Sequence, residues 1–184
     1  MNKVKIALLD RDGVINKDKG YVGFMSQFIW TKGAKKAIKY LKSKNYKIIV
    51  VSNQSGVARG FFKFKDVLKL HNKIQEELIS FGTKIDKFFF SPYHKDGIVK
   101  KYKIDHETRK PKIGMFKIIK KKYLIDKKES FMIGDKKTDM MFAKKCGIKS
   151  FLFKEDNLLK FIKKKIFRMT NRLKKNINSK TSFV

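Results

Sequence analysis

The chain has 184 residues, of which 42% are hydrophobic and 17 are phenylalanines. This length suits one domain with a substantial core, and this composition excludes an intrinsically disordered chain. Cys146 is the only cysteine, which excludes a disulfide framework, and no run reaches the ~18 apolar residues of a membrane span. The first dozen residues contain Asp10 and Asp12 and lack the apolar region of a signal peptide. We therefore expect a cytoplasmic monomer with no membrane partner.

Lysine dominates the charge of the chain. The formal net charge is +31, which is compatible with a nucleic acid or an anionic surface as partner, but only five of the 47 basic residues are arginines. Arginine is the usual side chain for base-edge and bidentate phosphate recognition, whereas dispersed lysine mainly forms a solvated surface. We therefore expect no specific nucleic-acid partner. Arg11, Arg59 and Arg109 are of more interest, because they fall in the loops described below.

The first predicted element is an apolar run, residues 5–9, that ends in Asp10, Arg11, Asp12 and Gly13. In an open α/β sheet, ligands bind at the C-terminal ends of the strands. Two carboxylates at i and i+2 in that place suit a hard divalent cation, and they supply a nucleophile beside an acid/base. Taken alone, the same residues are explained as well by a strand followed by an ordinary Asp-Gly turn.

Residues 17–31 form a loop with one stretch that is able to lie over a ligand, although a plain surface loop is as good an interpretation. That stretch is Asp18, Lys19, Gly20 and Tyr21. A helix follows, because Ala34, Ala37, Ile38 and Leu41 recur at helical spacing and Lys44-Asn45 ends the pattern.

The second strand covers residues 46–51 and leads into a polar turn that contains two glycines. A hydroxyl and amides at the end of a buried strand present donor groups and N–H dipoles to a phosphate, whereas the alternative is a β-to-α turn capped by Ser or Asn. The residues concerned are Ser52, Asn53, Gln54 and Ser55.

A longer helix is predicted from the apolar stripe Val67, Leu70, Ile74, Leu78 and Phe81, with Gly82 as its stop. Residues 86–90 follow as a third strand, and their three consecutive phenylalanines indicate burial on both faces. Residues 91–108 are irregular, and a loop of that length in a compact domain is usually functional. It closes on Arg109 and Lys110, just before a helix that we expect to begin at Pro111. Two cations just before a helix N-terminus are well placed to bind an anion. The alternative is that they are part of a basic surface.

The fourth strand, residues 130–133, delivers Asp135 and Asp139, which a helix beginning near Lys136 places on one face. Gly147 is the expected C-cap of that helix, and residues 148–153 form a fifth strand. A last amphipathic helix is expected to pack on the sheet or on a partner, with a frayed tail beyond Arg172. We thus expect a catalytic unit over residues 1–154 and a basic helix with its tail over 155–184, both in the same domain.

Strands that alternate with helices predict a doubly wound parallel sheet with helices on both faces and no large cap domain. Right-handed crossovers place the ends of all strands on one edge, so the polar loops should converge there. Asp10, Asp12 and Asp135 would then hold a cation, while Ser52, Lys110 and backbone N–H groups would hold an anion. This set suits phosphoryl transfer through an aspartyl-phosphate.

The order and spacing of these stretches resemble the haloacid dehalogenase superfamily of phosphatases over about residues 4–153. The four motifs are DRDGVIN from Asp10, SNQSGVARG from Ser52, RKPKIGM from Arg109 and IGDKKTD from Ile133. In these forms they resemble more narrowly the D-glycero-D-manno-heptose 1,7-bisphosphate phosphatases and the related histidinol-phosphate phosphatases. The resemblance implies a phosphatase that removes the C7 phosphate of the heptose bisphosphate, on the route to nucleotide-activated heptose for lipopolysaccharide or capsule.

The resemblance also implies residue roles. Asp10 would be the nucleophile and Asp12 the general acid/base. Asp10, Asp12 through its backbone carbonyl, and Asp135 would hold Mg²⁺. Ser52 and Lys110 would bind the transferring phosphoryl group, and Asp139 would orient Lys110 or the metal shell. The rest of the small sugar phosphate would face Asp18, Lys19, Gly20, Tyr21, Asn53, Gln54, Ser55, Arg109 and Lys136.

The sequence departs from the family in the loop before RKP, where relatives carry a zinc site built from Cys-x-His and Cys-x-Cys. The corresponding positions here are Ser91, Tyr93, His106 and Thr108. Thiolates are the ligands that make a structural zinc site strong. We therefore expect no zinc, and a loop held by local hydrogen bonds and packing.

Two other activities compete with the heptose substrate. Histidinol-phosphate phosphatase is the nearer one, but in relatives with that activity the domain is often fused to a dehydratase, which is not found in these residues. A polynucleotide 3′-phosphatase would give the positive charge a purpose and would predict salt-sensitive binding to DNA. We expect arginines and aromatic residues clustered near the site in that case.

Overall fold

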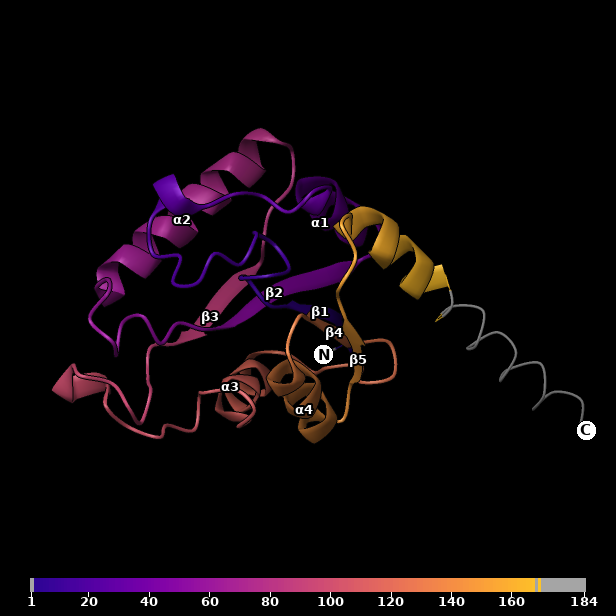
Figure 1. The fold of residues 1–184 in the computed structure, drawn as a ribbon. Helices are drawn as coiled ribbons and strands as arrows, with labels where there is room; N and C mark the ends of the chain where they lie inside the picture. The colour runs from indigo at the N-terminus through magenta and orange to yellow at the C-terminus, as the bar shows by residue number, and fades with distance from the viewer. Residues whose placement is uncertain (1, 168, 170–184) are drawn as a thin grey trace, which may run out of the picture.

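The computed structural model describes residues 2–167 and 169. It contains a five-stranded parallel sheet with the strand order β3-β2-β1-β4-β5, which confirms the predicted fold class (Figure 1). The strands are β1 (Lys5–Leu9), β2 (Tyr46–Asn53), β3 (Lys87–Ser91), β4 (Phe131–Gly134) and β5 (Lys149–Leu152). No large cap domain is inserted in the described part of the chain.

β1 is the central strand and lies at the topological switch point of the sheet. Leu9, its last residue, is in register with Val50 of β2 on one side and with Ile133 of β4 on the other. From β1 the chain first winds toward β3, and after β3 it crosses back to β4 on the opposite side. The crevice beyond the C-terminal ends of β1, β2 and β4 is therefore the place where such a sheet binds ligands.

Helices cover both faces of the sheet. They are α1 (Ala34–Ser43), α2 (Phe64–Ser80), α3 (Gly114–Lys122), α4 (Lys137–Cys146), a helical segment at 158–167, and the short 3-10 helices η1 (Met25–Gln27) and η2 (Lys100–Tyr102). In Figure 1, α1, α2 and the yellow segment 158–167 lie on one side of the sheet, and α3 and α4 lie on the other. Gly147 caps α4 with a φ of 71°, as its position predicted.

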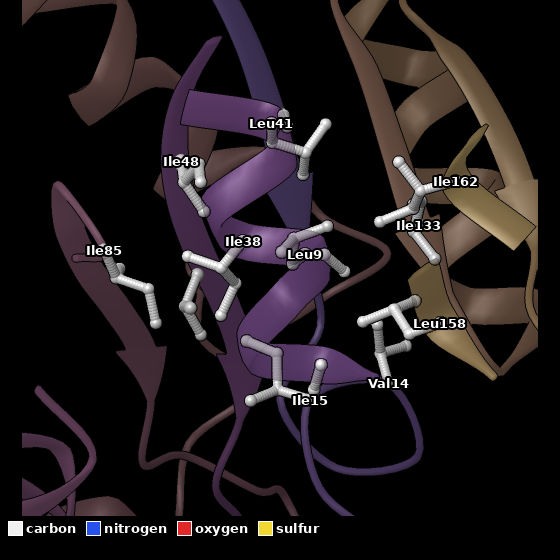
Figure 2. Packing of buried hydrophobic residues seen from close by; sticks show 14 of the residues in the cluster. Leu9, Val14, Ile15, Ile38, Leu41, Ile48, Ile85, Ile133, Leu158 and Ile162 are labelled. Carbon is white, nitrogen blue, oxygen red and sulfur yellow. The ribbon is translucent and has the colours of Figure 1, made fainter. Parts of the chain in front are cut away.

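Successive side chains of the buried strands point to opposite faces of the sheet, and each face has its own hydrophobic core. In β1, Ala7 and Leu9 pack into the cluster under α1 and α2, whereas Ile6 and Leu8 pack under α3 and α4. Figure 2 shows the first cluster, in which Leu9 lies beside Ile38 of α1. The site residues that follow β1 are thus anchored by a strand that is packed on both faces.

Two strand predictions need correction. β2 ends at Asn53 rather than at residue 51, because Ser52 and Asn53 stay in register with Phe90 and Ser91 of β3. The phenylalanines of β3 are only partly buried, although three in a row predicted burial on both faces. β3 is an edge strand with a neighbour on one side only, so its faces are covered less completely than those of β1.

Two helix predictions also need correction. α3 begins at Gly114, three residues after the expected start, because residues 109–112 form a turn in which the Lys112 N–H donates to the Arg109 carbonyl. α2 ends at Ser80, so Phe81 is its C-cap and is 37% exposed instead of completing the apolar stripe.

The C-terminal segment 158–167 belongs to the main core. Leu158, Phe161, Ile162 and Ile166 are buried in the same cluster as α1, and Met169 joins them. The predicted fraying beyond Arg172 lies outside the described residues. Among the helices of the described ranges, none is both long and apolar enough to cross a membrane.

Candidate active site

The polar loops converge at the C-terminal edge of the sheet around a cavity of about 340 Å³. Eleven of the predicted site residues line it, together with Val22, Gly56, Phe62, Thr138 and Asp139. The eleven are Asp10, Asp12, Asp18, Gly20, Tyr21, Ser52, Asn53, Gln54, Ser55, Lys110 and Lys136. They come from the end of β2, from the loops after β1, β2 and β4, and from the turn before α3, as the parallel topology predicted.

A buried ion-pair cluster forms the floor of the cavity. The Lys110 Nζ atom lies 3.1 Å from Asp10 Oδ1 and 2.6 Å from Asp139 Oδ1, and it also donates to the Val51 carbonyl at 2.7 Å. Asp10, Lys110 and Asp139 are all less than 8% exposed. Lys110 is therefore fixed by β2 and α4, and it presents its charge to the carboxylate at the end of β1.

Burial sets the protonation of this cluster. It raises the pKa of Asp10 to about 7, because Lys110 only partly offsets the loss of solvation and the nearby Asp139 and Asp12 oppose ionisation further. Burial alone would lower the pKa of Lys110, but Asp10 and Asp139 outweigh it and raise the pKa above its ordinary value. The lysine is consequently charged, whereas the raised pKa of Asp10 leaves that carboxyl group partly protonated at neutral pH.

Three carboxylates are placed to share a cation. Oxygens of Asp10, Asp135 and Asp139 lie within 4.8 Å of one another, and the buried Asp135 Oδ1 has no hydrogen-bond partner among the described residues. Hard oxygen donors of this kind suit Mg²⁺. Glycines make the close approach possible, because a Cβ on Gly13 would collide with the Asp135 carboxylate and one on Gly134 would collide with Asp139. The residues present therefore fit a divalent cation.

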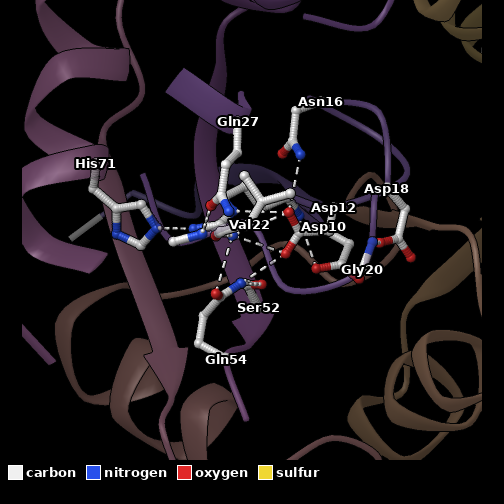
Figure 3. A network of polar contacts seen from close by, with 12 residues as sticks. Asp10, Asp12, Asn16, Asp18, Gly20, Val22, Gln27, Ser52, Gln54 and His71 are labelled. Atoms are coloured by element: carbon white, nitrogen blue, oxygen red, sulfur yellow. Dashed lines mark hydrogen bonds and ion pairs between the residues drawn. The ribbon is translucent and has the colours of Figure 1, made fainter. Parts of the chain in front are cut away.

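The Asp12 carboxylate faces a different set of partners. Its Oδ1 accepts hydrogen bonds from Arg11 and from Asn16 Nδ2 at 2.9 Å, and its Oδ2 accepts from Arg11 and from Gln54 Nε2 at 2.7 Å (Figure 3). The metal role predicted for Asp12 involves its backbone carbonyl, so this orientation leaves that role open as a prediction. The Asp12 side chain lines the cavity, where these hydrogen bonds fix its orientation. It is separate from the group of Asp10, Asp135 and Asp139.

The end of β2 and the turn that follows it are hydrogen-bonded to other parts of the site. Ser52 is buried, and its Oγ accepts a hydrogen bond of 2.8 Å from Gln54 Nε2. The Asn53 side chain exchanges two hydrogen bonds with the backbone of Lys110, at 2.9 and 3.0 Å. We predicted that Asn53 and Gln54 face the substrate. Their amide groups also form hydrogen bonds that position Lys110 and Asp12.

The loop after β1 closes over one side of the cavity. Lys136 Nζ lies 2.8 Å from Asp18 Oδ2, and the Asp18 Oδ1 atom accepts from the Gly20 N–H at 3.0 Å. The Tyr21 ring packs against Phe61, with the ring centroids 4.5 Å apart. This loop therefore reaches across to the start of α4; that it lies over a ligand stays a prediction.

Two predicted substrate residues do not line the cavity. Lys19 is exposed. Arg109 is half-buried and donates to the Tyr93 carbonyl at 3.1 Å. Burial and the neighbouring charge of Arg59 lower the pKa of Arg109. Arg59 Nη2 lies 3.3 Å from His94 Nε2, and burial together with both arginines lowers the pKa of His94. Arg59, His94 and Arg109 thus form a basic group, whose members are absent from the cavity lining.

The four positions of the altered loop contact one another. The Thr108 hydroxyl donates to Ser91 Oγ at 3.1 Å and lies 2.8 Å from His106 Nδ1. The His106 ring stacks on Tyr93 with a centroid distance of 4.0 Å. This arrangement agrees with the prediction that hydrogen bonds and packing hold the loop.

Comparison with known proteins decides the family. The family model described as polynucleotide kinase 3 phosphatase matches residues 5–155. The D-glycero-beta-D-manno-heptose-1,7-bisphosphate 7-phosphatase of Rhodopseudomonas palustris is 39% identical over 89% of this chain and 91% of its own. The chain belongs to the heptose-bisphosphate phosphatase family of the haloacid dehalogenase superfamily.

Further heptose-bisphosphate phosphatases agree with this assignment. The D-glycero-alpha-D-manno-heptose-1,7-bisphosphate 7-phosphatase of Photorhabdus laumondii is 38% identical over 83% of this chain and 84% of its own. The crystal structure of D,D-heptose 1,7-bisphosphate phosphatase from B. bronchiseptica, complexed with magnesium and phosphate, superposes with a TM-score of 0.74 at 28% identity. That match covers 88% of this chain and 87% of the other.

The structure also shows site residues that sequence reasoning missed. Thr138 lines the cavity, and nothing in its context distinguishes it from a helix-start threonine. His71 contacts Arg11 from the buried face of α2. A histidine at a position of the apolar stripe was the available signal for it.

Proposed function

We propose that this protein is a magnesium-dependent phosphatase that removes the C7 phosphate of D-glycero-D-manno-heptose 1,7-bisphosphate by way of a phosphoryl group on Asp10. It would act in the cytoplasm, as a monomer, on the route to nucleotide-activated heptose. The observation that carries the proposal is the buried Lys110, held between Asp10 and Asp139. Asp135 Oδ1, which has no hydrogen-bond partner among the described residues, belongs to the same group of carboxylates. The names of the relatives support the substrate.

The role proposed for each side chain is the one that the family resemblance implies. A carboxylate oxygen of Asp10 attacks phosphorus, and the bond between phosphorus and the C7 oxygen breaks as Asp12 gives that oxygen a proton. Water then attacks the aspartyl-phosphate, Asp12 takes its proton, and inorganic phosphate leaves with the Asp10 carboxylate restored. Lys110 and the Ser52 hydroxyl bind the phosphoryl oxygens throughout.

A divalent cation would be held by Asp10 and Asp135, with Asp139 beside them. When bound, Mg²⁺ neutralises charge on the phosphoryl oxygens. The B. bronchiseptica structure, which holds magnesium and phosphate, supports this choice of ion. The backbone carbonyl of Asp12 remains the proposed third contribution.

The basic group of Arg59, His94 and Arg109 is the proposed handle for the second phosphate of the substrate. The pKa of His94 is lowered mainly by burial and also by the charges of Arg109 and Arg59. The two guanidinium groups therefore lie close to the histidine. The buried Arg59 Nε has no hydrogen-bond partner within the described ranges. A phosphate dianion would supply both charge compensation and acceptors.

The test is phosphate release with Mg²⁺ from both anomers of the heptose bisphosphate, fructose 1,6-bisphosphate, histidinol phosphate and a 3′-phosphorylated oligonucleotide. A kcat/KM preference for one heptose anomer is the expected result. Preference for histidinol phosphate, or for the oligonucleotide to which the description of the matching family model points, would overturn the substrate but keep the mechanism.

A variant separates the mechanism from the substrate. Asp10→Asn should abolish turnover of whichever compound is best, because an amide is not a nucleophile here. The matched control is Glu76→Gln on the exposed side of α2, whose side chain is 61% exposed and which should keep full activity. Residual activity of Asp10→Asn at the wild-type level would refute the nucleophile assignment.

A further inference from the structure

Arg11 is a fully buried cation that holds the proposed acid/base. Its side chain is 0% exposed. Its Nε and Nη2 atoms donate to the Asp12 carboxylate at 3.0–3.2 Å, and Nη2 also donates to the carbonyl of Val22 and to Gln54 Oε1. Arg11 therefore cannot move without moving Asp12, because the planar guanidinium binds the carboxylate with two of its nitrogens.

The remaining nitrogen of this guanidinium meets a histidine from a distant helix. Arg11 Nη1 lies 3.4 Å from His71 Nε2, and this is its hydrogen-bond partner within residues 2–167. In Figure 3, a line of dashed contacts runs from His71 on α2 toward Asp12 and Gln54. The contact is buried, so loss of the histidine would leave a charged N–H group without water or another acceptor.

His71 Nε2 is suited to accept a hydrogen bond from Arg11 and not to donate one. Burial, reinforced by the charge of Arg11, lowers its pKa to about 3, so the ring is neutral at working pH. A neutral ring next to an arginine N–H offers the lone pair of Nε2 and carries its proton on Nδ1. Phe88 and Phe90 of β3 hold the ring, stacked at 4.5 Å and edge-on at 5.5 Å.

The position of His71 in α2 argues against a purely structural role. It lies on the buried face with Val67, Leu70 and Ile74, where an apolar side chain would fill the core without carrying polar atoms. A histidine there costs desolvation that packing alone would not require. The Nε2 contact with Arg11 is the compensation that the structure offers.

We propose that His71 is a positioning residue that acts through Arg11 to hold the Asp12 carboxylate against the phosphoryl site. The inference rests on the proposed acid/base role of Asp12. His71 touches neither the cavity lining nor the three-carboxylate group, so its effect should be on proton transfer and not on phosphate binding.

The test compares two amides at this position. The amide of His71→Gln reaches the place of Nε2 and keeps an acceptor for Arg11, whereas the shorter His71→Asn corresponds to Nδ1 and does not. We expect kcat per folded molecule to fall about tenfold in His71→Asn, since a charge-assisted hydrogen bond is lost, and to stay within about threefold of wild type in His71→Gln. The inhibition constant for inorganic phosphate should be unchanged in both.

Two controls separate this role from general damage. Ile74→Ala, one turn further along the same buried face, should lower thermal stability but leave kcat per folded molecule unchanged. Equal kcat in His71→Asn and wild type, or an equal loss in both amide variants, would overturn the inference. Asp12→Asn tests the underlying assignment: if that variant keeps full turnover, the proposed role of Asp12 fails, whatever His71 does.

Discussion

The Nζ atom of Lys110 lies 3.1 Å from Asp10 Oδ1 in a part of the molecule where both side chains are almost completely buried. The lysine is the one cation in direct contact with the carboxylates of the cavity floor in the described structure, and it serves Asp10 and Asp139 together. Asp135 Oδ1 has no hydrogen-bond partner in the part of the chain that the structure describes. The stability of the folded protein should therefore depend on the positive charge of Lys110 beside these carboxylates.

Replacing Lys110 by methionine should destabilise the protein strongly. Breaking a buried ion pair by removing one partner costs about 3–5 kcal/mol, because the remaining charges stay buried and unpaired. The loss should be larger at alkaline pH, where Asp10 and Asp139 must either ionise without a partner or keep a proton at a cost. Urea unfolding at two pH values measures this, and Lys110→Met combined with Asp139→Asn should recover part of the loss. Equal stability of Lys110→Met and wild type would contradict the role of the pair.

Magnesium should stabilise the protein more at high pH than at low pH. Burial raises the pKa of Asp10 to about 7 in the metal-free protein. A group with a raised folded pKa contributes its full stability below its ordinary value, and that contribution is lost as the pH rises through about 7. The cation competes with the proton for the ionised carboxylates, so the rise in Tm on adding Mg²⁺ should be larger at about pH 8 than at about pH 5.5. The same rise at both pH values in differential scanning fluorimetry would argue against Asp10 as a ligand.

Substitution of Arg59 or Arg109 by alanine should weaken recognition of bisphosphates selectively. A charge-assisted hydrogen bond contributes about 1.5–3 kcal/mol, so kcat/KM for the heptose bisphosphate should fall about 10- to 100-fold. Turnover of a monophosphate such as p-nitrophenyl phosphate, which lacks the second anion, should change little. Lys101→Ala, on the exposed part of η2, is a matched control for lost positive charge. A parallel loss on both substrates would place the two arginines outside substrate recognition.

The loop at 91–108 should not need zinc. The purified protein should contain well under one zinc per chain by elemental analysis, and a zinc-selective chelator should leave Tm unchanged in excess Mg²⁺. Thr108→Val, which removes the hydroxyl between Ser91 and His106, should instead cost about 1 kcal/mol and speed proteolysis in the loop. Stoichiometric zinc, or a Tm that falls on chelation, would refute the prediction.

The fold and the convergence of the polar loops follow from the sequence because their signals are local. A buried strand that ends in a polar turn is readable from a few residues, and the parallel topology then brings Asp10, Ser52, Lys110 and Asp135 to one edge. The burial of β3 was misjudged for the opposite reason. Whether a strand is central or at the edge depends on the order of all strands, which three consecutive phenylalanines do not encode.

The supporting contacts of the site could not be predicted in the same way. His71 and Arg11 are sixty positions apart, and their pairing depends on how α2 packs over β3. Lys19 and Arg109 are absent from the cavity lining, because Lys19 is exposed in the first loop and Arg109 donates to the Tyr93 carbonyl in the turn before α3. Side-chain direction in such turns is set by tertiary contacts.

The central position of β1 also has a consequence for how the protein folds. β1 and β4 are neighbours in the sheet but are far apart in the sequence, so their pairing carries a large loop-closure entropy and is expected to form slowly. Until β1 and β4 pair, Asp135 is not held next to Asp10, and the proposed divalent-cation site is incomplete. During refolding, the appearance of tight Mg²⁺ binding should therefore mark the closure of the β1–β4 seam and follow the recovery of helical signal.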